Sequence, residues 1–297
     1  MKKTIATLAA VLCCTMTASA QEAQEPQEAR NKVYTITLGH IEYAHHDEKL
    51  SADEAIGKLA TGVLTGHVAV EATKYEEDVK SAIIKGLSSA YRFRYNDGLL
   101  RLDDVAGEGN LIADALITNI QAKSDSHRQL GSKDDFKIET HYTGIVEAVL
   151  TLKDAKTGEI IANPTVGGWG SGHSSFSSSD KAVRAAIERL SGYVTQSLNK
   201  FRPMQANIIE AGTAKKDKQK EVYIDMGSSE GAFEGLHMGI YQIKKIAGRE
   251  AKSLLGKLKI EAVEGADISR CKVTSGAKDV KEALDAGEHL KVYSSSK

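Results

Sequence analysis

The sequence has little cysteine: Cys13 and Cys14 fall within the first 20 residues, and Cys271 is the third. Residues 1–20 have the features of a secretory signal peptide, with two lysines, an apolar segment over residues 5–16 and small residues before Gln21. Cleavage there leaves Cys271 alone, which excludes a disulfide within the mature chain. We predict a buried free thiol at Cys271, in preference to a disulfide between chains.

The sequence also lacks an excess of charge of either sign. It has 39 basic and 40 acidic residues, and loss of Lys2 and Lys3 with the signal peptide moves the formal net charge from −1 to −3. Nucleic-acid binders show a basic face and a high pI, so nucleic acid is not an expected partner. Neither Cys13 nor Cys14 follows the small residue typical of lipid-attachment signals. We therefore expect an exported, periplasmic protein without a lipid anchor.

Several histidines could act as metal ligands or catalytic bases, but the sequence around them lacks the motifs of such sites. His45 and His46, followed by two acids, show no HExxH or other ligand spacing, and we interpret them as a solvated loop. His173 lies among serines, but we find no GxSxG elbow in the sequence, and one loop rarely holds both nucleophile and base. Phosphate-binding GxxxxGK[ST] is absent. We predict no enzyme and no catalytic residue, cofactor, metal or small-molecule substrate.

Hydrophobic periodicity predicts a layered domain over residues 33–202, after a disordered polar leader at 21–32. Strands are expected at 33–41, 91–95, 110–121 and 144–153, although acid spacing in 110–121 also permits a helix. Capping boxes predict a short helix after Ser51 and a better one from Thr73, with Val79, Ile83 and Leu87 on its apolar face. Residues 122–135 are polar throughout and indicate a loop.

The rest of this domain is expected to contain a hairpin and a long helix. Residues 154–158 predict a turn, with a return strand at 159–162, and residues 167–179 a glycine-serine loop. Ser178 or Ser179 caps the helix, which ends before Pro203. Its apolar face comprises Val183, Ile187, Leu190, Val194 and Leu198. The expected fold is a set of strands covered on one face by two helices.

A second domain is expected at residues 203–297, because short β-like segments there alternate with turns. Six strands are predicted, at 206–210, 221–226, 238–246, 257–263, 268–274 and 289–293, with a short helix before the last. Residues 215–220 would form an exposed, charged hairpin tip. This pattern indicates a small β-barrel-like domain, so the whole chain is assigned to the α+β class.

Two segments carry a family resemblance. VLTLKDAKTGEII and SSSDKAVRAAIERLSGYVTQSLN resemble the periplasmic core of the CsgG family of curli-secretion proteins, which is similar to the N-terminal domain of TolB and the middle domain of FlgT. VYIDMGSSEGAFEGLHMGIYQI resembles the C-terminal β-domain of FlgT-type proteins. The resemblance covers residues 33–293. It implies a non-catalytic accessory or adaptor in a cell-envelope assembly of the curli, secretion or flagellar kind.

The resemblance also implies the partners: other envelope proteins, further copies of the chain in a ring, and peripheral contact with the outer membrane. A second interpretation is an activator of a peptidoglycan synthase, since such proteins resemble the same core. A third is a secretion channel. The channel is not expected, because AKSDSHRQLGSKDD and the segment 162–179 lack the apolar alternation of membrane-spanning strands.

The segment 223–243 places Gly227, Gly231, Gly235 and Gly239 four residues apart. A membrane helix is excluded by the acids between them, and a soluble helix would lose about 1 kcal/mol at each glycine relative to alanine. We predict consecutive turns: Gly227 ends a strand, Gly231 and Gly235 shape a compact connection, and Gly239 begins the next strand. A strained, ligand-binding loop is the alternative.

Four residues are candidates for interaction with partners. Trp169, the only tryptophan, and Phe176 lie in the glycine-serine loop, where they would serve as interface anchors or fold back onto the core. Arg92 and Arg94 alternate with Tyr91, Phe93 and Tyr95. We expect the aromatic side chains to be buried in the core and the two arginines to point outward.

Overall fold

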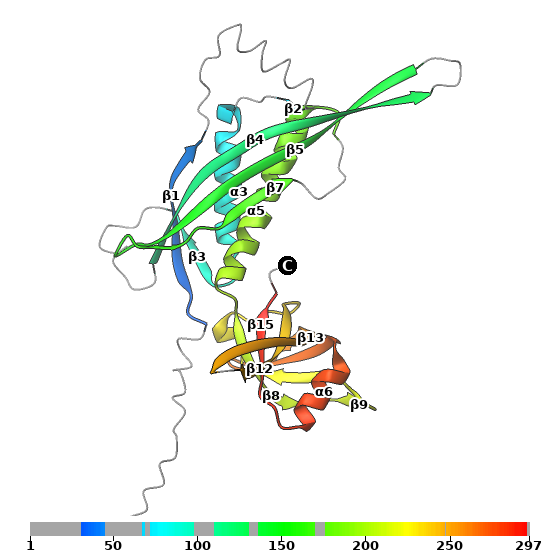
Figure 1. The fold of residues 1–297 in the computed structure, drawn as a ribbon. Helices are drawn as coiled ribbons and strands as arrows, with labels where there is room; N and C mark the ends of the chain where they lie inside the picture. Colours follow the sequence, from blue (N-terminus) through cyan, green and yellow to red (C-terminus); the bar gives the residue numbers. More distant parts are fainter. Residues whose placement is uncertain are drawn as a thin grey trace, which may run out of the picture.

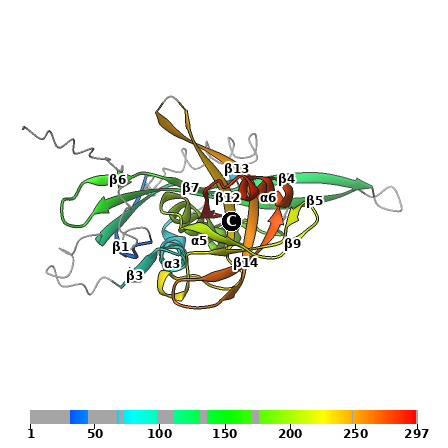
Figure 2. The same cartoon turned by 90° about the horizontal axis from the view of Figure 1, so that it is seen from below.

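The computed structural model describes residues 31–44, 67–68, 72–97, 110–130, 136–169, 176–246 and 248–295. They form a sheet-and-helix domain followed by a barrel (Figures 1 and 2). The signal peptide with Cys13 and Cys14, the leader up to residue 30, the His45–His46 pair, the helix predicted after Ser51, and His173 lie outside the described residues.

The first domain is built on one mixed sheet. Its strands run in the order β3-β1-β4-β5-β6, with β2 paired to β4 and β7 paired to β5. The strands are β1 Tyr34–Tyr43, β2 His67–Val68, β3 Phe93–Asn96, β4 Asn110–Leu130, β5 Phe136–Asp154, β6 Ile160–Ala162 and β7 Thr165–Trp169. The strands predicted at 33–41, 91–95, 110–121 and 144–153, and the return strand at 159–162, are confirmed.

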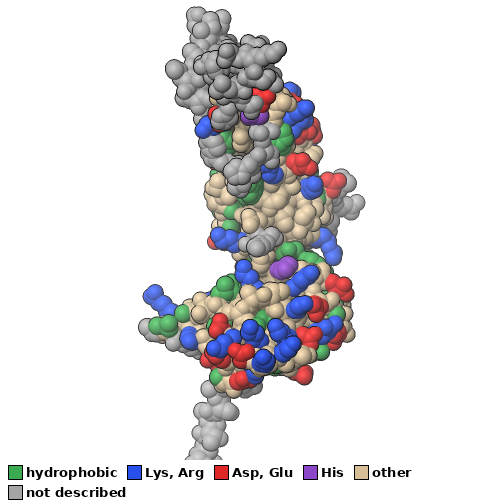
Figure 3. All heavy atoms as spheres, turned by 90° about the vertical axis from the view of Figure 1, so that its right-hand side faces the viewer, with side chains coloured by type: hydrophobic (Ala, Val, Ile, Leu, Met, Phe, Trp, Pro, Cys, Tyr) green, Lys and Arg blue, Asp and Glu red, His purple; other side chains and the backbone are tan. Residues whose placement is uncertain are grey.

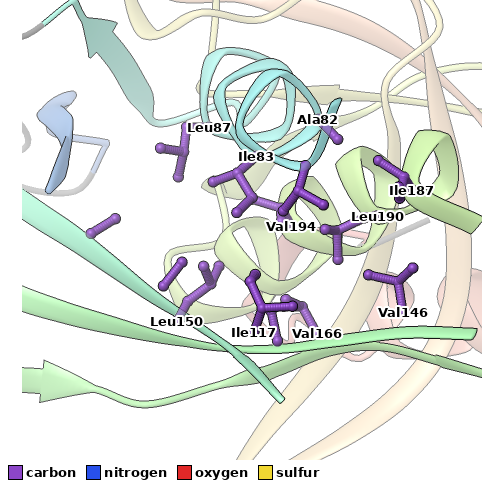
Figure 4. Close-up of a cluster of buried hydrophobic side chains, with 14 of the residues drawn as sticks. Ala82, Ile83, Leu87, Ile117, Val146, Leu150, Val166, Ile187, Leu190 and Val194 are labelled. Carbon is purple, nitrogen blue, oxygen red and sulfur yellow. The ribbon is translucent and has the colours of Figure 1, made fainter. Parts of the chain in front are cut away.

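Two helices, α3 (Glu76–Ser88) and α5 (Ser179–Phe201), cover one face of this sheet (Figure 1). Ser178 is the N-cap of α5, as predicted, and its Oγ accepts a hydrogen bond from Lys181 N. The predicted apolar faces of both helices are buried. Figure 4 shows the helical side chains packed over those of the sheet, among them Ile83, Leu87, Leu190, Val194, Ile117, Val146 and Leu150.

Three local predictions in this domain are wrong. The capping box at Thr73 does not form: residues 72–75 make the 3-10 turn η1, and Tyr75 occupies the N-cap of α3 without a side-chain cap. The loop predicted at 122–135 is largely β-structure, because β4 continues to Leu130 and β5 begins at Phe136. Residues 167–169, assigned to a loop, belong to β7.

The second domain is a closed six-stranded barrel, in the order β11-β14-β13-β12-β15-β8, with β8 next to β11. Its elements are β8 Gln205–Ala211, β11 Glu221–Ile224, β12 His237–Ile246, β13 Arg249–Val263, β14 Ser269–Ser275, α6 Ala277–Asp285 and β15 Leu290–Ser294. The charged tip is the predicted hairpin, made of β9 (Ala214–Lys215) and β10 (Lys218–Gln219). The α+β class with a C-terminal barrel is thus confirmed.

The barrel has its own apolar core and a mixed-charge exterior. Cys271 is a free thiol, fully buried in that core as predicted, and burial raises its pKa to about 12. Figure 3 shows basic and acidic side chains interspersed over the barrel surface. Arg270, for example, forms ion pairs with Glu221, Glu261 and Glu264. This pairing agrees with the near-zero net charge.

Three of the four glycines spaced by four residues lie in the turns between β11 and β12, as predicted, and the fourth is the third residue of β12. Gly231 and Gly235 have φ angles of 81° and 95°, in the left-handed region that favours glycine. At Gly227 a Cβ atom would lie 2.3 Å from the Ala266 carbonyl oxygen, so the backbone approach itself requires glycine. Gly239 lies inside β12, where a Cβ would meet the Tyr241 ring at 2.7 Å.

Side chains from both domains meet where α5 passes into β8. Asn31 is 8% exposed; its Nδ2 donates to Gln205 O at 2.7 Å, and its Oδ1 accepts from Gln205 N at 2.9 Å. The disorder predicted for residues 21–32 is therefore wrong at Asn31. The rings of Tyr91 and Phe233 lie 5.5 Å apart across the same junction. These contacts link the first domain to the barrel.

Candidate interaction surface

The β4–β5 hairpin is longer than the core that supports it. The two strands stay in antiparallel register from Leu111↔Asp154 to Leu130↔Phe136. Figure 1 shows their far end projecting beyond α3 and α5. We use the term outer ribbon for residues 125–130 and 136–141, which pair as Asp125↔His141 through Leu130↔Phe136. Within the described chain, no third strand pairs with the outer ribbon.

The base of the ribbon is fixed against the start of α5. A Cβ atom on Gly144 would lie 2.0 Å from the Ala182 carbonyl oxygen, so only glycine allows β5 to approach the helix so closely. Ala122, on the neighbouring strand, is fully buried. The core therefore ends near these two residues, and the ribbon extends from a firmly packed base.

Two of the predicted interaction residues also attach to this base. Phe176 and Tyr142 exchange two backbone hydrogen bonds, of 2.9 and 3.0 Å. Trp169 pairs through its backbone with Ile145 at the end of β7; its side chain is outside the described part. Sequence position alone placed these residues in one loop, whereas the sheet places both beside β5. They lie next to the ribbon, as an interface anchor would have to.

The described side chains of the outer ribbon are polar. Asp125 and Ser126 are exposed, and Ser126 Oγ lies 3.0 Å from Thr140 Oγ1 on the opposite strand. His141 Nε2 lies 3.9 Å from Glu139 Oε2. An isolated two-stranded hairpin is at best marginally stable in water, and here no described side chain supplies an apolar face. The ribbon offers backbone and polar side-chain groups for contact with another protein.

An ion network ties together the starts of both helices beside the ribbon base. Asp180 accepts hydrogen bonds from Lys74 Nζ (2.6 Å), Tyr75 Oη (3.0 Å) and Arg184 Nε (3.2 Å), and Arg184 also pairs with Asp78. The bond from Lys74, followed by that from Tyr75, lowers the pKa of Asp180 to about 2. Burial and the hydrogen bond to Asp180 raise the pKa of Tyr75 to about 12. The network fixes the helix ends that carry the ribbon.

A second charged pair lies on the opposite face of the sheet. Asp114 on β4 accepts hydrogen bonds from Lys153 Nζ (2.5 Å) and His40 N (2.9 Å). Burial would raise the pKa of Asp114, but these two bonds outweigh it, and the pKa is lowered. The pair therefore joins the neighbouring strands β4 and β5 and contacts β1, well inside the sheet.

The two arginines proposed as interaction residues lie elsewhere. Arg94 is exposed on β3, which is the far edge of the sheet from β7. Arg92 is only 4% exposed, so the expectation that it points outward is wrong. It donates to Lys32 O and Pro203 O, because the junction between the domains covers it. Arg92 is thus a junction residue, and neither arginine belongs to the ribbon.

The described residues show neither a metal site nor a membrane-spanning helix. They contain no group of three or more histidine, cysteine or acidic side chains placed to hold a metal ion. None of their helices is long and apolar enough to cross a membrane. Residues 227–231 read GSSEG, which fits GxSxG, so the expectation that the sequence lacks this pattern is wrong. Its Ser229 Oγ donates to Ala266 O at 2.6 Å and lies 3.0 Å from Asp267 Oδ1, so this hydroxyl holds a turn together.

Comparison with solved structures yields matches of low sequence identity and low TM-score. No family model and no curated protein sequence matches the chain. A neuraminyllactose-binding hemagglutinin homolog from Helicobacter pylori is 12% identical, with TM-score 0.32, covering 60% of this chain and 84% of its own. PelC from Paraburkholderia phytofirmans, solved as a dodecamer, is 10% identical, with TM-score 0.27, covering 58% and 89%.

A protein of family DUF330 from Xanthomonas campestris is 9% identical, with TM-score 0.28, covering 58% of this chain and 84% of its own. Similarity this low does not identify a function for the chain. The class that the structure itself defines is an α+β protein, in which a helix-covered sheet with a projecting ribbon precedes a closed barrel.

Proposed function

We propose that this chain is a non-catalytic accessory or adaptor protein of a cell-envelope assembly, exported to the periplasm, that acts by protein–protein recognition. The outer ribbon is the proposed contact, and further copies of the chain, arranged in a ring, are the proposed first partner. One observation supports this most: the hairpin continues in register well past its core, and its described side chains there are polar. The family resemblance of the sequence points the same way.

A recognition role explains why such a ribbon is built on rigid elements. Gly144 and the Asp180 network fix the base from which the ribbon projects. Strand edges pair readily with other chains, and polar side chains keep such an edge from aggregating at random. A partner strand would extend the sheet through backbone hydrogen bonds.

The test is the native mass of the mature protein, released from cells without detergent, for the wild type and a shortened variant. In the variant, Asn-Gly replaces residues 127–139 and joins Ser126 to Thr140, which are paired in the hairpin. We expect a discrete oligomer for the wild type and a folded monomer for the variant. The double variant Lys215→Ser, Lys218→Ser, at the exposed tip of the barrel, should remain oligomeric.

Other outcomes distinguish the alternatives. A wild-type monomer would contradict the ring, and specific capture of a peptidoglycan synthase would then support the activator. Release only with detergent would support the secretion channel. An oligomer that survives the shortening would place the interface outside the outer ribbon.

A further inference from the structure

Three cationic side chains gather around one aromatic ring at the domain junction. Lys32 Nζ, Arg92 Cζ and Arg202 Cζ lie 6.0, 5.6 and 5.5 Å from the centroid of Tyr34. They come from three separate segments: the residues before β1, before β3 and after α5. We call Lys32, Arg92 and Arg202 the junction cluster. The fold, and not the local sequence, brings these charges together.

None of the three residues of the junction cluster forms an ion pair with a carboxylate in the described part of the chain, and Glu230, an acid at the same junction, accepts a hydrogen bond from Asn31 Nδ2. The ion pairs formed there involve other residues, and Arg92 donates only to neutral acceptors, Lys32 O at 3.1 Å and Pro203 O at 3.2 Å. Arg92 is nevertheless 4% exposed. Buried charges in proteins are normally paired, because their desolvation is otherwise uncompensated. The cluster thus carries three positive charges that no direct ion pair within the described residues offsets.

Arg202 also presents an unused donor. Its guanidinium lies 4.7 Å from the centroid of Phe201 and packs over Tyr34, yet its Nε is buried and has no hydrogen-bond acceptor. Burial lowers the pKa of Arg92; the positive charge of Arg202 acts in the same direction, while Tyr34 opposes it. Arg92 and Arg202 therefore repel each other, and a nearby anion would stabilise the charged form of both.

The dipole of helix α5 offsets only part of the positive charge of the junction cluster. Helix α5 ends at Phe201, next to Arg202, and its C-terminal end carries about half a unit of negative charge. Three positive charges lie beside it. Within the cluster Lys32 is exposed, Arg202 is half-buried and Arg92 is buried, so an anion would approach from the side of Lys32.

We infer that the junction cluster binds a small oxyanion of the phosphate class. Guanidinium groups match phosphate oxygens with paired N–H donors, the lysine adds a point charge, and a doubly charged anion offsets more of the cluster than one carboxylate would. Inorganic phosphate and a phosphomonoester headgroup share this chemistry. The inference does not depend on the proposed function, since the cluster and the outer ribbon are different parts of the chain.

The test is titration calorimetry of the mature protein with sodium phosphate, with sodium chloride holding the ionic strength constant. We expect one saturable site per chain, and a Kd at least tenfold weaker in Arg202→Gln. Arg94→Gln is the matched control: its arginine is exposed on the adjoining strand, and its Kd should stay within twofold of the wild type. Lys32→Gln, at an exposed residue, should weaken binding several-fold and keeps the test valid if Arg202→Gln does not fold.

Cosedimentation with phosphatidylcholine vesicles, with and without phosphatidic acid, distinguishes the two sources. Binding to phosphatidic acid that is lost in Lys32→Gln identifies a headgroup, whereas phosphate binding without vesicle binding identifies a free anion. The inference is overturned if the wild type shows no saturable phosphate binding. It is equally overturned if Lys32→Gln and Arg202→Gln bind phosphate as tightly as the wild type.

Discussion

Asp180 shows how much one surface carboxylate organises in this protein. It is the second residue of α5, two positions after the N-cap Ser178. Its two carboxylate oxygens accept hydrogen bonds from Lys74, Tyr75 and Arg184. A carboxylate in the first turn is also favoured by the helix dipole. The sequence shows Asp180 directly after the two candidate cap residues, Ser178 and Ser179. It could not place Lys74 and Tyr75 there, because they lie over a hundred positions earlier in the chain.

The lowered pKa of Asp180 predicts a specific pH dependence. Its pKa falls from the usual 3.8 to about 2 in the folded state, so it stabilises the fold above pH 4 and loses that contribution as the pH falls from about 4 to about 2. Asp180→Asn should be less stable than the wild type at pH 6, and the difference should shrink by pH 2. Urea unfolding across this range measures it. A constant difference, or an equal effect of Asp217→Asn in the exposed β9–β10 turn, would contradict the assignment.

At the scale of elements, two close approaches position the helices. Gly86 on α3 leaves no room for a side chain, since a Cβ would lie 2.5 Å from Val194 Cβ and 2.7 Å from Ser191 O. Gly144 does the same between β5 and α5. Helix α3 thus packs on α5, and α5 on the sheet, at distances that only glycine allows. The sequence indicated both helices and the strand, but nothing local marked these two glycines.

Gly144→Ala should therefore destabilise the first domain by about 1–3 kcal/mol, the usual range for overpacking, because the added methyl group meets backbone atoms of α5. Gly192→Ala is the matched control within α5. A Cβ there meets nothing within 4 Å, and alanine in a helix should stabilise by about 0.5–1 kcal/mol. Chemical denaturation of both variants gives the comparison. Equal effects would contradict the close approach at Gly144.

The outer part of the β4–β5 hairpin is the largest region whose structure the sequence did not predict. Strand prediction depends on alternation of apolar and polar residues, and that alternation exists only where one face is buried. Beyond Ala122 and Gly144 the hairpin leaves the core. Residues 123–129 of β4 are polar there, although Phe136, Ile138 and Tyr142 of β5 still alternate with polar residues. The backbone ladder nevertheless continues to Leu130↔Phe136. A polar strand outside a core has the composition of a loop.

At the scale of the whole molecule, the junction decides how the two domains are joined. Asn31 bonds to both backbone groups of Gln205 and donates to Glu230 Oε1 at 3.1 Å, while Tyr91 N donates to Asn199 Oδ1 at 2.9 Å. Tyr91 also packs on the barrel core. The segment before β1, the end of α3 and the end of α5 all take part, so the junction is distributed over the first domain.

Asn31→Ala should lower the unfolding free energy by about 1–3 kcal/mol, because the buried backbone groups of Gln205 lose their partners. Asn163→Ala is a matched control at an exposed asparagine that accepts one bond from Thr151, and its effect should stay within about 0.5 kcal/mol. Thermal unfolding measures both. If Asn31→Ala were as mild as Asn163→Ala, the junction would not depend on this residue.

The sequence by itself determined most of the local structure: the apolar faces of both helices, the cap at Ser178, the glycine turns at Gly231 and Gly235, the six barrel strands and the buried thiol of Cys271. Each of these follows from periodicity or backbone preference within a few residues. Only the tertiary structure decided that Arg92 is buried, that Trp169 and Phe176 flank one strand, and that Lys32, Arg92 and Arg202 surround Tyr34. These contacts join segments that are distant in the sequence. They depend on core packing and on the register of the strands, which no local sequence pattern shows.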